Sequence, residues 1–296
     1  MTLGPEPSKA TTAQLLPMYP PPSDSDSRVP VHGRYLDPEV AVLEEAALRA
    51  GEQPLVYANF VTSLDGRIAL GAAEGDSHVP RALTTPTDWR LFQELQAHAD
   101  CFITHGAYLR ALAAGRLSNI LQVGLRADGA DLLAWRDQRG LTRQPAVVIA
   151  SHTLDFVLPK SLTEHGQSVV VVTSSDAPQA RKRRLEEEDG VQVMTAQQNG
   201  PVGASDLLEA VRALGCSRAY LEAGPTVLGS MLRGGHLGCL YLTLGHRLLG
   251  GDAFHTLVNG PPLGQDSGSL RMEQLYLLAA AKGHDGQFFA RFRPGP

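Results

Sequence analysis

Hydrophobic positions along the chain follow two alternating patterns. Continuous runs of apolar and β-branched residues predict buried strands at 55–62, 100–104, 146–150, 168–173 and 218–222. Between these runs, apolar residues recur at helical spacing, which predicts amphipathic helices at 85–99, 106–114, 132–139 and 206–214. Strands that alternate with helices are typical of an α/β sheet, mostly parallel, with helices on both faces.

The last part of the chain has a different pattern. Two strand segments, 270–281 and 287–292, are separated by Gly283-His284-Asp285-Gly286, which has the composition of a hairpin turn. The sequence therefore predicts a C-terminal antiparallel hairpin added to the parallel sheet.

Two segments precede the first core strand. Residues 1–30 are rich in Pro, Ser, Asp and Thr and predict a disordered tail, because they have little apolar surface to bury. Residues 31–53 contain an apolar stripe between Pro38 and Gly51, which predicts a helical extension that packs on the domain or on a partner subunit. Residues 54–296 form the predicted main domain.

The region from Arg218 to Asp252 organises the chain. A buried strand ending at Glu222 is followed by a turn, a helix that begins at Pro225, and a Gly234-Gly235 stop. The free N–H groups at the start of this helix favour an anion such as a phosphate or pyrophosphate. The alternative is that the glycines only allow the helix to pack closely on the sheet. The candidate binding residues are Gly224, Pro225, Thr226, Val227, Leu228, Gly229 and Ser230.

A second motif, Ser63-Leu64-Asp65-Gly66-Arg67, follows the first core strand. Gly66 permits a tight turn, and Asp65 and Arg67 place an acid and a fixed cation at the mouth of the sheet. A plain surface turn with a local ion pair is the alternative interpretation.

These two motifs, together with Leu248-Leu249-Gly250-Gly251-Asp252, resemble the reductase domain of the bifunctional riboflavin-biosynthesis deaminase-reductase. The resemblance covers roughly residues 54–292. It implies a dihydrofolate-reductase-like fold, NADPH as cofactor, and hydride transfer to the ribosylamino carbon of a 5-amino-6-(5-phosphoribosylamino)uracil-like substrate.

The resemblance also assigns individual residues. Thr62 and Ser151 match positions that contact the cofactor, and Glu222 matches one that contacts the substrate. Arg67 is expected to bind substrate as well. Asp65 is expected to orient the substrate or relay a proton, and Glu222 is the second candidate catalytic residue.

The chain departs from the family pattern around the substrate. Gln96 stands where the family has an arginine, and the Asp-Asp-Pro pattern after the next strand is absent. Arg90, Arg110 or Arg116 are candidates to replace the phosphate contact. Two other functions therefore stay open: reduction of a pterin, dihydrofolate or other small heterocycle, and NADPH binding without catalysis.

Missing motifs and composition narrow the function further. The chain has no His-x-Glu with Pro-Cys-x-x-Cys, the signature of a zinc deaminase, and no Gly-x-Gly-x-x-Gly. The formal net charge of −5 argues against a nucleic-acid surface. Three widely spaced cysteines predict reduced thiols and a cytoplasmic protein. No metal site and no membrane segment are expected, and the family resemblance implies a homodimer.

Overall fold

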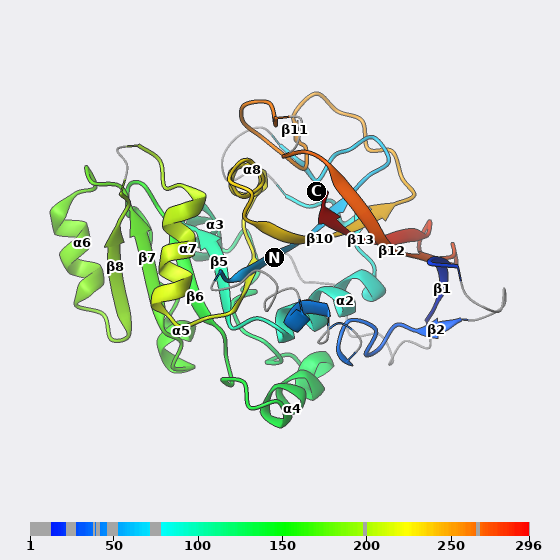
Figure 1. The fold of residues 1–296 in the computed structure, drawn as a ribbon, viewed down its shortest axis with the longest axis horizontal. Coiled ribbons are helices and arrows are strands. Elements are labelled where there is room, and N and C mark those ends of the chain that lie inside the picture. Colours follow the sequence, from blue (N-terminus) through cyan, green and yellow to red (C-terminus); the bar gives the residue numbers. More distant parts are fainter. Residues whose placement is uncertain are drawn as a thin grey trace.

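An eleven-stranded sheet runs through the molecule in the order β2-β1-β12-β13-β10-β3-β9-β5-β6-β7-β8 (Figure 1). The structure is a computed structural model that describes residues 13–21, 28–37, 39, 42–45, 53–71, 78–197, 200–264 and 267–295. The strands are β1 Gln14–Tyr19, β2 Val29–Pro30, β3 Leu55–Thr62, β5 Cys101–His105, β6 Ala146–Ala150, β7 Val169–Thr173, β8 Val191–Thr195, β9 Arg218–Leu221, β10 Leu237–Gly245, β12 Leu270–Leu278 and β13 Gln287–Pro294. A separate two-stranded sheet joins β4 Ala69–Leu70 to β11 Phe254–His255.

The strands from β10 to β8 are all parallel to their neighbours. On the other side of β10, strands β13, β12, β1 and β2 pair in antiparallel fashion. The predicted fold class is confirmed, including the C-terminal antiparallel pair of β12 and β13.

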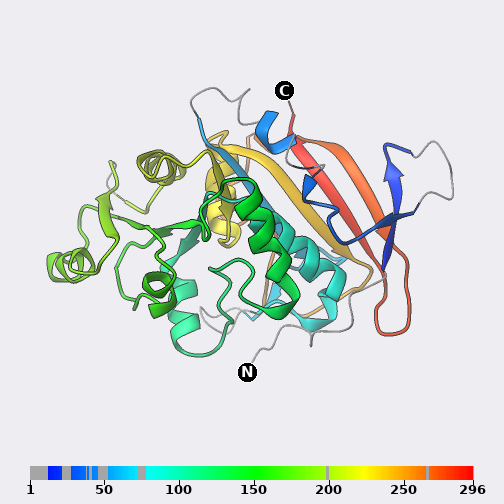
Figure 2. The same ribbon diagram turned by 90° about the horizontal axis from the view of Figure 1, so that it is seen from below.

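Helices cover both faces of the sheet, with α8 above it and α2 and α4 below it in Figure 1; Figure 2 shows α2 (cyan) and α4 (green) from below. The helices are α2 Pro86–Ala97, α3 Gly106–Ala113, α4 Ala130–Gln138, α5 Lys160–Glu164, α6 Gln179–Glu186, α7 Ala204–Ala213 and α8 Pro225–Arg233, with 3-10 turns η1 Arg81–Leu83 and η2 Ala127–Gly129. Two hydrophobic clusters result, one beneath α2 to α6 and one beneath α7 and α8. Central strands contribute to both: on β5, Phe102 belongs to the first cluster and Ile103 to the second.

The N-terminal residues correct one prediction. Residues 14–19, assigned to a disordered tail, form β1 and pair with β12, with Leu15 fully buried in the first cluster. Pro17 interrupts the short apolar run there, so the run gave a weak strand signal. Val29–Pro30, from the same predicted tail, form β2 and pair with β1. Residues 1–12 and 22–27 of that predicted tail lie outside the described residues.

The expected N-terminal helix is described only in part. Asp37, Glu39 and residues 42–45 are helical, and Leu43 is fully buried in the first cluster. The Glu39 carboxylate accepts a hydrogen bond from Tyr241 Oη at 2.9 Å and pairs with Arg291. This segment therefore packs on the antiparallel side of the sheet.

A smaller correction concerns α7. The sequence offers Ser205 as the cap of the helix predicted at 206–214, but the helix starts at Ala204, and Ser205 lies within its first turn. The Asp206 carboxylate instead accepts a hydrogen bond from Gly203 N at 2.9 Å.

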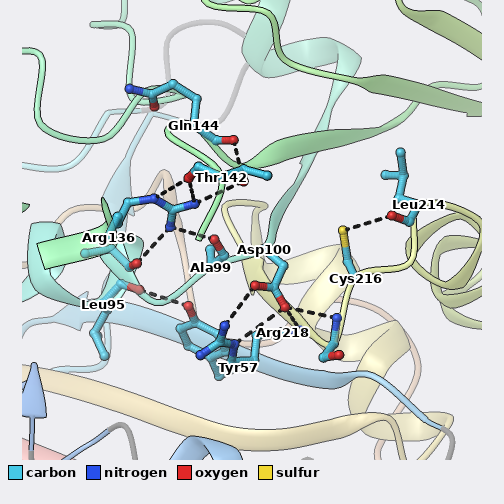
Figure 3. A network of polar contacts seen from close by, with 12 residues as sticks. Tyr57, Leu95, Ala99, Asp100, Arg136, Thr142, Gln144, Leu214, Cys216 and Arg218 are labelled. Carbon is cyan, nitrogen blue, oxygen red and sulfur yellow. Dashed lines mark hydrogen bonds and ion pairs between the residues drawn. The ribbon is translucent and has the colours of Figure 1, made fainter. Parts of the chain in front are cut away.

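Arg136 joins α4 to the end of α2 beneath the sheet (Figure 3). Its side chain is fully buried and donates to the carbonyl oxygens of Ala97 and Ala99, each at 2.8 Å, and to that of Thr142 at 2.6 Å. Burial lowers the pKa of its guanidinium to about 10. Because this cation satisfies the buried carbonyl groups of Ala97 and Ala99, it fixes the position of α2 against the sheet.

Replacing Arg136 with methionine is expected to lower the free energy of unfolding by about 3 kcal/mol, since the buried carbonyl groups of Ala97 and Ala99 lose their donor. Urea denaturation measures this change. Arg183→Met on the exposed side of α6 is the control, and we expect a change within about 0.5 kcal/mol. Equal stability of the two variants would contradict this role of Arg136.

Candidate functional site

The carboxyl ends of the parallel strands lie at one edge of the sheet, and the chain leaves two adjacent strands there in opposite directions. From β9 the chain continues into α8 and then to β10, which lies beyond β3. From β5 it continues into α3 and on towards β6, which lies on the side of β5 away from β9. α8 and α3 pack in different core clusters, through Leu228 and Leu109. Such a reversal opens a crevice between the two helices, which is where α/β sheets bind ligands.

Two helix N-termini meet in this crevice. Gly224 is the N-cap of α8, with Pro225 as its first residue, and His105 is the N-cap of α3, its Nδ1 accepting from Tyr108 N at 3.2 Å. A Cβ built on Gly224 would come no closer than 3.9 Å to its nearest neighbour, His105 Nε2. The backbone at Gly224 is therefore open to close approach by an anion.

Within the predicted Gly224-to-Ser230 set, the side chains have different positions. Gly224 and Pro225 line the cavity described below, and Thr226 is exposed. Leu228 is fully buried in the core beneath α8. A Cβ on Gly229 would lie 2.8 Å from Asn259 O, so this glycine allows a neighbouring loop to pack on the helix. Only the start of α8 faces the crevice.

The hydroxyl groups of Ser151 and Thr62 make local contacts. Ser151 follows β6, and its Oγ accepts a hydrogen bond from Leu154 N at 3.1 Å. A Cβ on Gly106 would lie 2.9 Å from the same Oγ, which places Ser151 at the start of α3 and in the crevice. Thr62 ends β3, and its Oγ1 is 3.2 Å from Ser63 O, to which it donates.

Asp65 joins two loops. Its carboxylate accepts hydrogen bonds from Leu249 N at 3.2 Å and Gly250 N at 2.9 Å, and it also contacts Ser63 Oγ and the Arg67 guanidinium. The Ser63 hydroxyl is the largest of several contacts that hold the pKa of this carboxyl well below its usual range. The two family motifs are thus tied together through Asp65, and this arrangement favours a structural role over proton donation.

Arg67 has little freedom to bind a substrate. Besides the pair with Asp65, its Nη2 donates to Gly251 O at 3.1 Å, and its guanidinium lies 4.3 Å from the centre of the Phe254 ring. Neither Asp65 nor Arg67 is among the residues that line the cavity.

A cavity of about 430 Å³ opens beside the start of α8, on the α2 side of the sheet. Its walls come from the ends of β3 and β9, the first turns of α2, and the β4/β11 pair. The lining residues are Asn59, Phe60, Val61, Ile68, Ala69, Val79, Thr84, Asp88, Trp89, Phe92, Ile120, Glu222, Gly224, Pro225 and His255. The size is typical of a site for a small molecule.

Glu222 is a predicted site residue that lines the cavity. Gln96 Nε2 donates to Glu222 Oε1 at 2.9 Å and to Ile120 O at 2.7 Å. Burial raises the pKa of the Glu222 carboxyl to about 8, and the Gln96 hydrogen bond opposes this shift. Glu222 therefore holds a proton at neutral pH.

Asp88 is a second carboxyl in the cavity, which the sequence analysis did not assign to the site. Thr85 Oγ1 accepts from Asp88 N at 3.1 Å and donates to Gln287 Oε1 at 2.6 Å, so the helix start is fixed to β13. Burial raises the Asp88 pKa to about 6, despite a hydrogen bond with Thr243. One sequence signal was available: Asp88 lies four residues before Phe92, on the apolar side of the predicted helix.

Within the described ranges, no cluster of three or more His, Cys, Asp or Glu residues could hold a metal ion. None of the helices in that part of the chain has both the length and the apolar character needed to span a bilayer.

Comparisons with solved structures agree on the fold. A pyrimidine reductase-like protein from Corynebacterium diphtheriae is 20% identical with a TM-score of 0.61, and the match covers 82% of this chain and 92% of that one. RibD from Acinetobacter baumannii is 21% identical with a TM-score of 0.60 over 87% of this chain, which spans 63% of the RibD chain. The riboflavin biosynthesis reductase Rib7 of Saccharomyces cerevisiae is 16% identical with a TM-score of 0.55, over 86% and 100%.

Sequence comparisons identify the family. No curated protein matches the sequence. The model of the RibD C-terminal domain matches residues 54–283, which is most of the chain and includes both motifs and the cavity. The chain belongs to the RibD C-terminal domain family, which supports an activity as a reductase.

Proposed function

We propose that this protein is an NADPH-dependent reductase that transfers hydride to a small nitrogen heterocycle. The pyrimidine reductase step of riboflavin biosynthesis, on a 5-amino-6-(5-phosphoribosylamino)uracil-like compound, is the first candidate because of the family. One observation carries the proposal: Gly224 and Pro225 belong both to the helix start in the crevice and to the wall of the cavity that contains Glu222. A cofactor held in the crevice thus lies beside a substrate in the cavity.

The residues in the crevice suit a dinucleotide. The open backbone at Gly224 and the positive end of α8 favour a pyrophosphate, with Thr226 in the first turn adding a hydroxyl. Thr62 ends β3, which pairs with β9, and Ser151 follows β6, which pairs with β5. When bound, NADPH supplies the hydride.

Glu222 is the proposed proton donor. Reduction of a C=N bond forms a new C–H bond with the hydride and leaves the nitrogen in need of one proton. Glu222 is protonated near neutral pH, and Gln96 fixes its carboxyl by a 2.9 Å hydrogen bond. In this proposal Trp89 and Phe92, whose rings stack 5.1 Å apart, provide an apolar wall for the heterocycle.

A second candidate is the reduction of a pterin, a dihydrofolate or another heterocycle that lacks a ribose phosphate. It is favoured by Gln96, which stands at the family's arginine position. It is also favoured by the cavity lining, in which none of the described residues is lysine or arginine. Binding of NADPH with no acceptor reduced would favour the remaining alternative, a non-catalytic protein.

The direct test is NADPH oxidation by the purified protein with the phosphoribosylaminouracil, with dihydrofolate, and with no acceptor. Turnover above the no-acceptor control supports a reductase, and the acceptor that reacts decides between the two candidates. No turnover with any acceptor, despite NADPH binding, would contradict the proposed activity.

We also propose a cytoplasmic homodimer. An apolar sheet face supports the dimer: Leu242, Leu244, Leu275, Leu277 and Phe288 are only partly buried. Their paired positions place them on one face, since Leu244 and Leu277 are both opposite Phe288. The cysteines Cys101, Cys216 and Cys239 are free thiols, as expected in a reducing compartment.

Phe288→Asp is expected to convert the dimer to a monomer, because a charge in an apolar interface is costly to desolvate. Light scattering measures the mass. Glu186→Gln, on the exposed side of α6, should leave the mass unchanged. A monomeric unmodified protein would contradict the dimer.

The pH dependence of turnover tests the proton donor. Because the protonated form of Glu222 is the active one, kcat should be constant below pH 7 and fall as pH rises through about 8. Glu222→Gln should lower kcat by about 100-fold and remove this pH dependence. Glu186→Gln is again the control. An unchanged kcat and pH profile in Glu222→Gln would exclude Glu222 as the donor.

Asp65→Asn separates the structural from the catalytic role of Asp65. An amide accepts fewer hydrogen bonds and carries no charge, so the contacts with Leu249 N and Arg67 weaken. We expect a decrease in Tm of a few degrees with kcat within about threefold of the unmodified protein. A 100-fold loss of kcat at unchanged Tm would support Asp65 as a proton relay instead.

A further inference from the structure

The cavity wall carries acids without a compensating fixed cation. Of the described residues that line it, Asp88 and Glu222 are carboxyl groups, and none is lysine or arginine. Both carboxyls line the same cavity of about 430 Å³. They therefore lie close enough together to meet one small ligand.

The arginines near the cavity are already paired. Arg90 is bound by Glu94 at 2.7 Å and Asp131 at 2.6 Å, which removes it as a replacement for the family's arginine. Arg126 lies 5.5 Å from the centre of the Trp89 ring and 3.7 Å from Asp128. Gln96, the residue that touches Glu222, is neutral.

This arrangement discriminates between ligands by charge. A phosphate placed in the cavity would face the Asp88 carboxylate with no guanidinium to neutralise it, and like charges in a low-dielectric site repel strongly. A ring N–H or an exocyclic amino group would instead donate to the Asp88 carboxylate in a charge-assisted hydrogen bond. Trp89 and Phe92 offer flat aromatic surface to such a ring.

We propose that this cavity selects a planar amino-substituted heterocycle without a phosphate group, whose N–H edge donates to the Asp88 carboxylate and whose ring lies beside Glu222. The inference rests on the proposed reductase function for the identity of the cavity as the substrate site. It deepens that function by naming the class of substrate: an aminopyrimidine, a pterin-like ring or the corresponding unphosphorylated glycoside. Gln96 and Asp88 are the residues that set this specificity.

Binding by isothermal titration calorimetry at pH 7, with the full chain and no NADPH, tests the inference directly. The probes are 2,4-diaminopyrimidine, cytidine and cytidine 5′-monophosphate, the last two differing only in the phosphate. We expect cytidine to bind at least tenfold more tightly than its monophosphate. Equal or tighter binding of the monophosphate overturns the inference, and so does failure of 2,4-diaminopyrimidine to bind at millimolar concentration.

Variants assign the selectivity to the named residues. Asp88→Asn should weaken binding of 2,4-diaminopyrimidine at least tenfold, whereas Asp137→Asn, on the exposed side of α4, should not change it. Gln96→Arg should raise the affinity for cytidine 5′-monophosphate at least tenfold, because it places a guanidinium beside Glu222. Unchanged affinities in both cavity variants overturn the inference, and the wild-type comparison stands even if one variant fails to fold.

The outcome is separable from that of the proposed function. NADPH binding, measured in parallel by its fluorescence, reports on the crevice and not on the cavity. Loss of NADPH binding with the expected ligand selectivity would refute the reductase and leave the cavity specificity intact. NADPH binding together with a preference for cytidine 5′-monophosphate would refute the cavity specificity and leave the proposed reductase function intact.

Discussion

The parallel hydrogen bonding of β9 between β3 and β5 determines where the chemistry of this protein can occur. Because all three strands run the same way, their carboxyl ends deliver Thr62, Glu222 and His105 to one edge of the sheet. The connections from β9 and β5 then leave on opposite faces, which separates the starts of α8 and α3 and opens the crevice. A change in the register of β9 by one residue would turn Glu222 away from the cavity and into the other core.

The elements around this edge are held by buried polar contacts. Arg136 fixes the end of α2, and the Thr85 and Gln287 side chains fix its start. Asp88 therefore lines the cavity, and Gln96 contacts Glu222, from a helix attached at both ends. Asp65 attaches the loop after β3 to the loop that contains Gly250. These contacts hold Asp88 and Glu222 in fixed positions in the cavity wall, where burial raises the pKa of both carboxyl groups.

The sequence predicted the architecture well because periodicity reports burial. The bounds of β3 and β6 agree with the apolar runs, and the start of α2 agrees with its Thr85 cap and Pro86. β1 escaped prediction because its pairing with β12 joins residues far apart in the chain, and such contacts have no local signature. Membership in the RibD C-terminal domain family confirms the resemblance that the two motifs indicated.

The site was predicted less completely than the fold. Motif spacing located Glu222 and the start of α8, but it gave no information on which hydrogen bonds Asp65 would make across the chain to Gly250. The role of Asp88 depends on the rotation of α2 against the sheet, which tertiary packing decides. The replacement of the family's arginine by Gln96 was visible in the sequence, whereas its contact with Glu222 required the structure.

The most direct test of the account is the affinity for NADPH when a negative charge is placed at the start of α8. Thr226 is exposed in the first turn, so Thr226→Glu should fold normally and weaken NADPH binding at least tenfold by repelling the pyrophosphate. Ala130→Glu, the same change at the exposed first residue of α4, should leave the Kd unchanged. An unchanged Kd in Thr226→Glu would contradict the central claim that the start of α8 holds the cofactor.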